Sequence, residues 1–157
     1  MWAIGWLACA SDEGPGNGPA LLFDDTVAAL VAATGRHGER VLGATAMSPV
    51  RDEEQDYAAW CTGQWDTLGS CMDAFMACDD EAAHGGMHDG MHGDGMDGWH
   101  DQLDDLADAM DAHHDAMDGC STLECCWAEE AAWQDHAGAM FDAMGDAEPA
   151  WDEDCGW

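Results

Sequence analysis

Apolar side chains recur along the chain at alternating steps of four and three residues, the spacing that gathers them on one face of a helix. The first such stripe is formed by Phe23, Val27, Leu30, Thr34, His37 and Val41. Asp24 and Asp25 suit the positive N-terminal end of a helix, and Gly43 suits a C-terminal cap. The pattern therefore predicts a helix over residues 24–42.

A second helix is expected to begin at Ser48 and Pro49, because an N-cap residue followed by proline favours a helix start. It is expected to run to about Ala77, with a stripe formed by Tyr57, Cys61, Gln64, Leu68, Cys71, Phe75 and Cys78. Over residues 79–98 the periodicity is lost, and Gly, Asp, Met and His alternate. This composition predicts a flexible linker.

The stretch over residues 99–118 repeats the stripe of the first helix at a constant offset of 76, so that His113 corresponds to His37. A fourth helix is predicted from Ser121 or Thr122 to Asp146. Its Ala-Ala-Trp sequence at 131–133 is similar to that at 58–60 in the second helix, at an offset of 73. These matches indicate duplication of a two-helix unit.

Two helical hairpins predict an all-α fold, an antiparallel four-helix bundle. Strand signals are nearly absent, because β-branched residues are few and no alternating run occurs. The expected segments are a signal-like, lipoprotein-type N-terminus and tether (1–21), a bundle (22–147) with hairpins at 22–78 and 99–147 around the linker 79–98, and an acidic C-terminal tail (148–157).

The charge balance is extreme, with 34 acidic residues against three basic ones and a formal net charge of -31. Such a surface repels phosphate backbones and anionic lipids, which argues against nucleic-acid binding and electrostatic membrane contact. It attracts cations. The alternative interpretation is that these carboxylates only keep a secreted protein soluble.

The N-terminal residues Leu7, Ala8 and Cys9 resemble the end of a bacterial lipoprotein processing box, which would make Cys9 a lipidation site. No stretch approaches the ~20 apolar residues that span a bilayer, so attachment is expected through lipid alone. This pattern predicts an extracytoplasmic protein, periplasmic or on the outer surface. The alternative is an unprocessed N-terminal segment.

Eight cysteines in a chain of 157 residues also indicate an oxidising compartment. Besides Cys9, the disulfide candidates are Cys61, Cys71, Cys78, Cys120, Cys125, Cys126 and Cys155. Cys78 could pair with Cys155 at one end of the bundle, and Cys120 with Cys125 or Cys126 at the other. Seven cysteines leave at least one thiol free within a monomer, available as a metal ligand.

Histidine and methionine concentrate between positions 84 and 117, which hold six of the eight histidines and five of the eleven methionines. Imidazole and thioether are ligands that soft, late transition metals prefer, above all Cu(I). The candidate ligands in and beside the linker are His84, Met87, His88, Met91, His92, Met96 and His100. A linker has no core in which to bury these side chains, so hydrophobic packing does not explain them. The alternative interpretation is a disordered acidic spacer whose composition results from codon bias.

Further candidate ligands lie on the predicted helices: His37, Met110, His113, His114, Met117, His136 and Met140. His37 and His113 occupy equivalent inward positions and could face each other across the bundle, whereas His114 is expected to point outward. His136 and Met140 are one turn apart, and Met144 follows by a further turn. For methionines at helical spacing, ordinary core packing is the competing interpretation.

Catalysis has little support, because the chain has no nucleophile elbow and no phosphate-binding loop with lysine, and no glutamate precedes His113, His114 or His136 at the Glu-x-x-His spacing of the di-iron bundles. The His113-His114-x-x-Met117 element, the Met/His-rich linker and the lipoprotein-like N-terminus together resemble the His/Met-rich helical metal-binding proteins of bacterial envelopes. The resemblance covers residues 84–144 and implies copper or related metal handling outside the cytoplasm.

The resulting hypothesis is a non-catalytic protein that sequesters or buffers copper, with nickel or zinc as alternative metals. A competing hypothesis is a disulfide-stabilised structural or interaction domain without a specific metal site. A metal-dependent enzyme is a third, weaker one.

Overall fold

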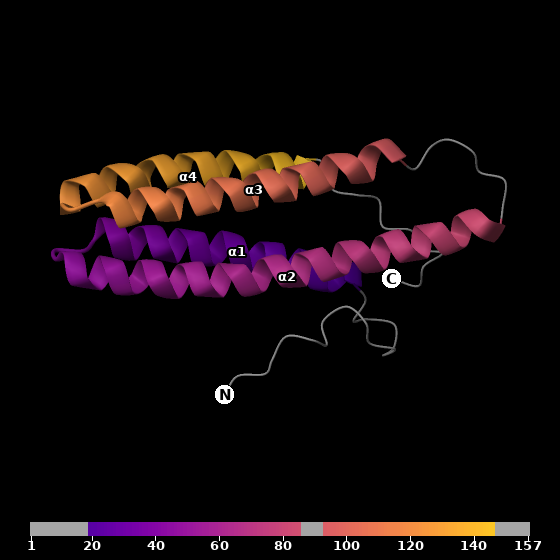
Figure 1. The fold of residues 1–157 in the computed structure, drawn as a ribbon, viewed down its shortest axis with the longest axis horizontal. Helices are drawn as coiled ribbons and strands as arrows, with labels where there is room; N and C mark the ends of the chain where they lie inside the picture. The colour runs from indigo at the N-terminus through magenta and orange to yellow at the C-terminus, as the bar shows by residue number, and fades with distance from the viewer. Residues whose placement is uncertain (1–18, 86–92, 147–157) are drawn as a thin grey trace, which may run out of the picture.

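The computed structural model describes residues 19–85 and 93–146 and contains four helices (Figure 1). They are α1 (Pro19–Leu42), α2 (Met47–Gly85), α3 (Gly93–Gly119) and α4 (Leu123–Asp146). Each helix runs antiparallel to the next, and α1 packs against α2 and α4 while α3 packs against α4 and α2. The all-α four-helix bundle is therefore confirmed, with α1 and α3 on one diagonal and α2 and α4 on the other.

The short connections after α1 and α3 lie at the same end of the bundle, which we call the loop end (Figure 1). At the first of them, the backbone N–H of Gly43 donates to the carbonyl oxygen of Glu39 over 3.0 Å. A Cβ atom at Gly43 would lie 2.9 Å from the same oxygen. Glycine is required here because a side chain would collide with the last turn of α1.

Helix α2 and helix α3 both extend into the segment predicted as a linker. Helix α2 continues to Gly85 and α3 begins at Gly93, so only positions 86–92 lie between them. Ala82 and Ala83, which have the highest helix propensity, favour continuation of α2. Local propensity thus accounts for the extension of α2 but not for that of α3, whose first six residues include three glycines.

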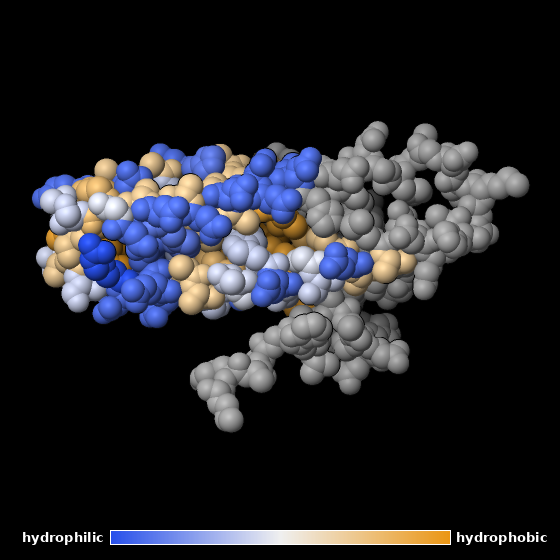
Figure 2. Space-filling view, viewed as in Figure 1, coloured by the Kyte–Doolittle hydropathy of each residue, from blue (hydrophilic) through white to orange (hydrophobic). Residues whose placement is uncertain are grey.

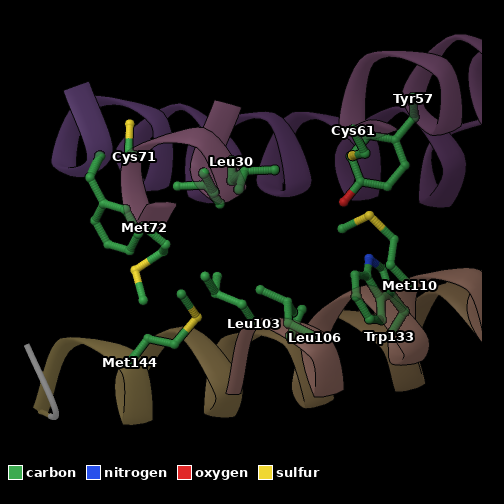
Figure 3. Packing of buried hydrophobic residues seen from close by; sticks show 13 residues of the cluster. Leu30, Tyr57, Cys61, Cys71, Met72, Leu103, Leu106, Met110, Trp133 and Met144 are labelled. Atoms are coloured by element: carbon green, nitrogen blue, oxygen red, sulfur yellow. The ribbon is translucent and has the colours of Figure 1, made fainter. Parts of the chain in front are cut away.

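The buried apolar residues form two clusters along the bundle. In the larger one, Leu30 and Met72 of the first hairpin face Leu103, Leu106 and Met144 of the second (Figure 3). The smaller one lies at the loop end and is formed by Val41, Val50, Met117, Cys120 and Cys126. On every helix, buried polar side chains separate the members of the two clusters: Thr34 and His37 on α1, and one residue on each of the other helices.

Burial shows that both pairs of helices repeat at an offset of 76, which corrects the offset of 73 inferred for α2 and α4. The latter offset would make Trp60 equivalent to Trp133, yet Trp60 is 37% exposed and Trp133 is 3% exposed. Tyr57, which the offset of 76 makes equivalent to Trp133, is 5% exposed. The Ala-Ala-Trp match is misleading because the two tryptophans lie on different faces of their helices.

Polar side chains cover most of the face shown in Figure 2, and apolar side chains are visible between them. In the described part of the chain, no helix is both long enough and apolar enough to cross a membrane.

Candidate metal centre

Each of the four helices places one buried polar side chain at the same level of the bundle. These residues are His37 on α1, Glu54 on α2, His113 on α3 and Glu130 on α4, between 0% and 6% exposed. Each occupies the position on its inward stripe between the two apolar clusters, so helix packing carries all four into the interior. We refer to them as the His/Glu centre.

The side-chain ends of the His/Glu centre converge on one point. The Nε2 atom of His37 lies 2.8 Å from Oε2 of Glu54 and 3.2 Å from Oε2 of Glu130. The Nε2 atom of His113 is 3.2 Å from the same Glu130 oxygen. One ligand atom from each residue lies within 4.8 Å of those of the other three.

These contacts have the lengths of ion pairs but not the angles of hydrogen bonds. Within the described residues, Nε2 of both histidines and Oε2 of both glutamates are buried without a hydrogen-bond partner. A buried polar atom without a partner costs roughly 1–3 kcal/mol, more when it is charged. Four such atoms converge on one point, where a cation could satisfy all four.

The geometry fits a metal ion. Ligand atoms bound at about 2.0–2.1 Å around a tetrahedral ion lie about 3.3 Å apart. Two contacts are close to this at 3.2 Å, the contact between His37 and Glu54 is shorter at 2.8 Å, and all four ligand atoms lie within 4.8 Å of one another. Two imidazoles and two carboxylates suit divalent ions such as Zn²⁺, Cu²⁺ or Mn²⁺ better than Cu(I), which prefers sulfur. The cluster can therefore hold a metal ion, with one ligand from each helix.

The charges of the centre are strongly coupled. Burial by itself would lower the pKa of His37, but contacts with Glu130 and Glu54 and their negative charges raise it to about 9. Burial would likewise raise the pKa of both glutamates, yet each pKa is lowered to about 2, chiefly by His114 and His37 at Glu54 and by His113 and His37 at Glu130. Both carboxylates are thus ionised and ready to bind a cation.

Aromatic rings hold the two histidines from equivalent positions in the two hairpins. The ring of Tyr57 stacks on His37 with centroids 4.0 Å apart, and the ring of Trp133 stacks on His113 with centroids 5.1 Å apart. The Tyr57 hydroxyl is in turn hydrogen-bonded to Oγ1 of Thr34 over 2.7 Å. These contacts orient the imidazoles before any ligand is present.

The residues around the centre differ between the two hairpins. The side chain of Gln134 donates a hydrogen bond of 2.8 Å to Glu130, whereas Glu54 is contacted by Nδ1 of His114. The offset of 76 makes His114 equivalent to Gly38, and Gly38 leaves room for Gln134. Each carboxylate therefore has its own supporting partner, as metal-binding carboxylates usually do.

His37 also has a carboxylate behind its ring. The Nδ1 atom of His37 is 3.5 Å from Oε1 of Glu53, and Glu53 accepts hydrogen bonds from Arg40. Glu53 and Tyr57 also line a cavity of about 220 Å³ between α1 and α2, together with Ala33, Arg36, Arg40, Asp56 and Trp60.

The structure brings together part of the ligand set predicted from sequence. His37 and His113 meet with ring centroids 6.1 Å apart, as expected for equivalent inward positions. The prediction that His114 points outward is wrong, because its side chain is only 16% exposed and contacts Glu54. Neighbouring residues on one helix can both reach the interior when the adjacent helix offers a charged partner.

The predicted methionine ligands whose side chains the structure describes pack in or against the apolar clusters. Met110 is buried in the larger apolar cluster and Met117 in the smaller, and Met140 packs at the edge of the larger one. His136 is exposed, which removes it from an inward ladder with Met140 and Met144. For these methionines, core packing is the interpretation that the structure supports.

The candidates in and beside the linker fall outside what the structure describes. Met87, His88, Met91 and His92 lie outside the described residues, and the side chains of His84, Met96 and His100 are not described although their backbones are helical. Cys9 and Cys155 also lie outside the described residues. Lipidation and metal binding at these positions stay predictions.

The sequence-based prediction missed Glu54 and Glu130, two of the four members of the His/Glu centre. The Glu-x-x-His motif joins two residues of one helix, whereas these glutamates lie on α2 and α4 and the histidines on α1 and α3. In sequence, both glutamates otherwise resemble the acidic surface residues around them. The available signal is that the two glutamates are related by the offset of 76, as the two histidines are. Extending the stripe of α2 back from Tyr57 by one helical turn also places Glu54 inside.

The cysteines follow the prediction in part. Cys120 and Cys125 form a disulfide at the loop end, one of the two pairings considered, and Cys71 is disulfide-bonded. Cys61 and Cys126 are free, which corrects their assignment as disulfide candidates. The side chain of Cys78 is not described. Burial raises the pKa of both free thiols, that of Cys61 to about 12.

Comparison of the chain with family models, curated proteins and solved structures gives no match. The function must therefore be argued from the geometry of the site.

Proposed function

We propose that the protein takes up and holds a divalent transition-metal ion at the His/Glu centre, without catalysis. The observation that carries this proposal is the convergence of four buried, unpartnered ligand atoms, one from each helix. A cation at this point would satisfy all four and neutralise the two carboxylates.

The donor set supports a class of metal. Imidazole and carboxylate bind borderline and hard divalent ions, and affinities within such a site generally increase toward Cu²⁺, with Zn²⁺ weaker than Cu²⁺. The copper hypothesis is therefore kept here in its divalent form, with Zn²⁺ as the main competitor. The net charge of -31 would raise the local concentration of either cation near the surface.

Storage is favoured over catalysis because the site offers four protein ligands and almost no exposure to solvent. Catalytic metal sites keep a coordination position open for water or substrate, whereas closed four-ligand sites hold the metal. Export or lipid attachment at Cys9 would place this storage outside the cytoplasm, as the sequence suggests.

The competing function is a structural one, in which the His/Glu centre is a buried ion-pair network that fixes the packing of the two hairpins. The 2.8 Å contact between His37 and Glu54 favours it. Buried ion pairs of this kind often cost more in desolvation than they return. The two functions differ in one respect, namely whether a cation binds tightly.

The test is a titration of the purified protein with Zn²⁺ and Cu²⁺ in the presence of a competing chelator. Against wild type, the double variant His113→Asn/Glu130→Gln should lose one tightly bound equivalent. The control variant His136→Asn removes an exposed histidine of α4 and should keep the wild-type count. Equal counts in wild type and the double variant would refute the proposal and favour the ion-pair network.

A further inference from the structure

Sulfur atoms from three separate segments gather at the loop end of the bundle. Cys126 is buried in the smaller apolar cluster with Met117 and Cys120, and Met47 and Cys125 pack against it. These residues come from the start of α2, the end of α3 and the start of α4. Their arrangement is separate from the His/Glu centre, which contains no sulfur.

Within this group, one thiol and one thioether face each other. The thiol of Cys126 donates a weak hydrogen bond to Sδ of Met47, with the two sulfur atoms 4.0 Å apart. The thiol is free although a disulfide lies beside it, because Cys120 is bonded to Cys125, the residue next to Cys126. Cys126 is 1% exposed, so this thiol lies away from solvent.

The separation of the two sulfur atoms suits a soft metal ion. Metal–sulfur bonds of about 2.3 Å subtend an angle of about 120° when the sulfurs are 4.0 Å apart, the angle of three-coordinate binding. Met117 offers a further thioether in the same cluster. Thiolate and thioether ligands select Cu(I) over harder divalent ions.

We propose that Cys126 and Met47 form a second metal site, which binds Cu(I) at the loop end of the bundle. On binding, the S–H bond of Cys126 breaks, its proton passes to solvent and a copper–thiolate bond forms. Met47 contributes a lone pair of its sulfur. Copper enters and stays as Cu(I), so neither the protein nor the metal changes oxidation state and the disulfide stays intact.

This site is independent of the proposed function, because it shares no residue with the His/Glu centre. Together the two sites would sort metals by chemistry, with divalent ions bound by nitrogen and oxygen at mid-bundle and Cu(I) bound by sulfur at the loop end.

The test is a titration with Cu(I), kept reduced by ascorbate, against a chromophoric Cu(I) chelator. The variant Cys126→Ala should lose one tightly bound equivalent. The variant Met47→Leu should lower the affinity for that equivalent by at least about tenfold, because tenfold is the smallest loss usual even for residues that only support a metal ligand. The matched controls are Cys61→Ala, at the other free buried thiol, and Met144→Leu, at a buried core methionine. Both should bind as wild type does.

X-ray absorption at the copper edge gives a second measurement on the same samples. Wild type loaded with one equivalent should show sulfur neighbours at about 2.3 Å, and Cys126→Ala should lose them. Met47→Leu conserves volume and keeps the fold testable if Cys126→Ala proves unstable. Unchanged Cu(I) binding in both variants, or equal losses in the Cys61→Ala control, would overturn the proposal. Loss of the divalent site alone, in His113→Asn/Glu130→Gln, should leave Cu(I) binding unchanged.

Discussion

His37 shows how much of this protein's chemistry depends on the neighbours of one side chain. An imidazole taken out of water favours its neutral form, and burial alone would lower its pKa. Contacts with Glu130 and Glu54 reverse that effect and raise the pKa to about 9. A proton therefore occupies the place that a metal would take, and the two compete for the same nitrogen.

The first prediction concerns pH. Since the pKa of His37 is raised from 6.5 to about 9, its ion pairs stabilise the metal-free fold fully below pH 6.5, and this contribution is lost as the pH rises through 9. Since the pKa of Glu54 and of Glu130 is lowered from 4.5 to about 2, their contribution is present above pH 4.5 and lost as the pH falls through about 2.

Metal affinity should increase with pH up to about 9, with about one proton released per ion.

Urea unfolding of metal-free protein at several pH values tests the first part of this prediction. The difference in unfolding free energy between wild type and His37→Gln should shrink as the pH rises from 6.5 to about 9. Metal titrations in buffers of different ionisation enthalpy count the released proton. A difference that stays constant over this range would contradict the assigned ion pairs.

At the scale of the helices, the four ligands match between the two hairpins at one offset, whereas the residues around them differ. His37 and His113, and likewise Glu54 and Glu130, are related by the same offset of 76. The supporting residues are not: α1 has Gly38 where α3 has His114, and α4 uses the free space for Gln134. Gln134 also donates a hydrogen bond of 2.8 Å to the backbone oxygen of Thr34, which joins α4 to α1.

The second prediction concerns this contact between α1 and α4. A Cβ atom at Gly38 would lie 2.6 Å from the side-chain nitrogen of Gln134, so Gly38→Ala should push Gln134 away from Glu130. Both Gly38→Ala and Gln134→Ala should weaken metal binding by about 10- to 100-fold without removing a ligand. The measurement is a chelator competition at fixed pH.

Gln55→Ala provides the control, because Gln55 is an exposed residue of α2. It should bind metal as wild type does. If Gln134→Ala also left the affinity unchanged, the carboxylate of Glu130 would not depend on this support.

At the scale of the whole molecule, the His/Glu centre joins the two hairpins across the bundle interior. Packing between α2 and α3 is sparser than packing within either hairpin, and the three basic residues cannot neutralise 34 acidic ones. Self-repulsion therefore opposes the compact state. A bound divalent ion would tie all four helices together and remove two buried negative charges.

The third prediction follows from that linkage. At a free metal concentration about 100 times the dissociation constant, binding to the folded state alone should raise the free energy of unfolding by about 2.7 kcal/mol. Urea unfolding with and without Zn²⁺ measures the change. Removal of the metal with a chelator should reverse it, and His113→Asn/Glu130→Gln should not show it. An equal increase in that variant would mean that the stabilising ion binds elsewhere.

The sequence by itself determined the four helices, because the period of apolar positions and the capping residues are local properties. It did not determine the end of α2, at Gly85 instead of about Ala77, or the start of α3, at Gly93 instead of about Trp99. It also identified His37 and His113 as equivalent inward residues. The offset of α2 and α4 was wrong because a short Ala-Ala-Trp match carries no information about which helix face is buried.

Only the tertiary structure decided which residues meet. The apolar stripe of α2, extended by one turn, places Glu54 inside, but the meeting of Glu54 and Glu130 with the histidines depends on four helices presenting side chains at one height. The same holds for Cys126 and Met47, which are far apart in the sequence and touch only because the loop end brings α2 and α4 together. The apolar stripe of a helix shows which of its side chains point toward the core. A site also requires that these side chains lie at the same height along the bundle, and the packing of the helices alone decides that height.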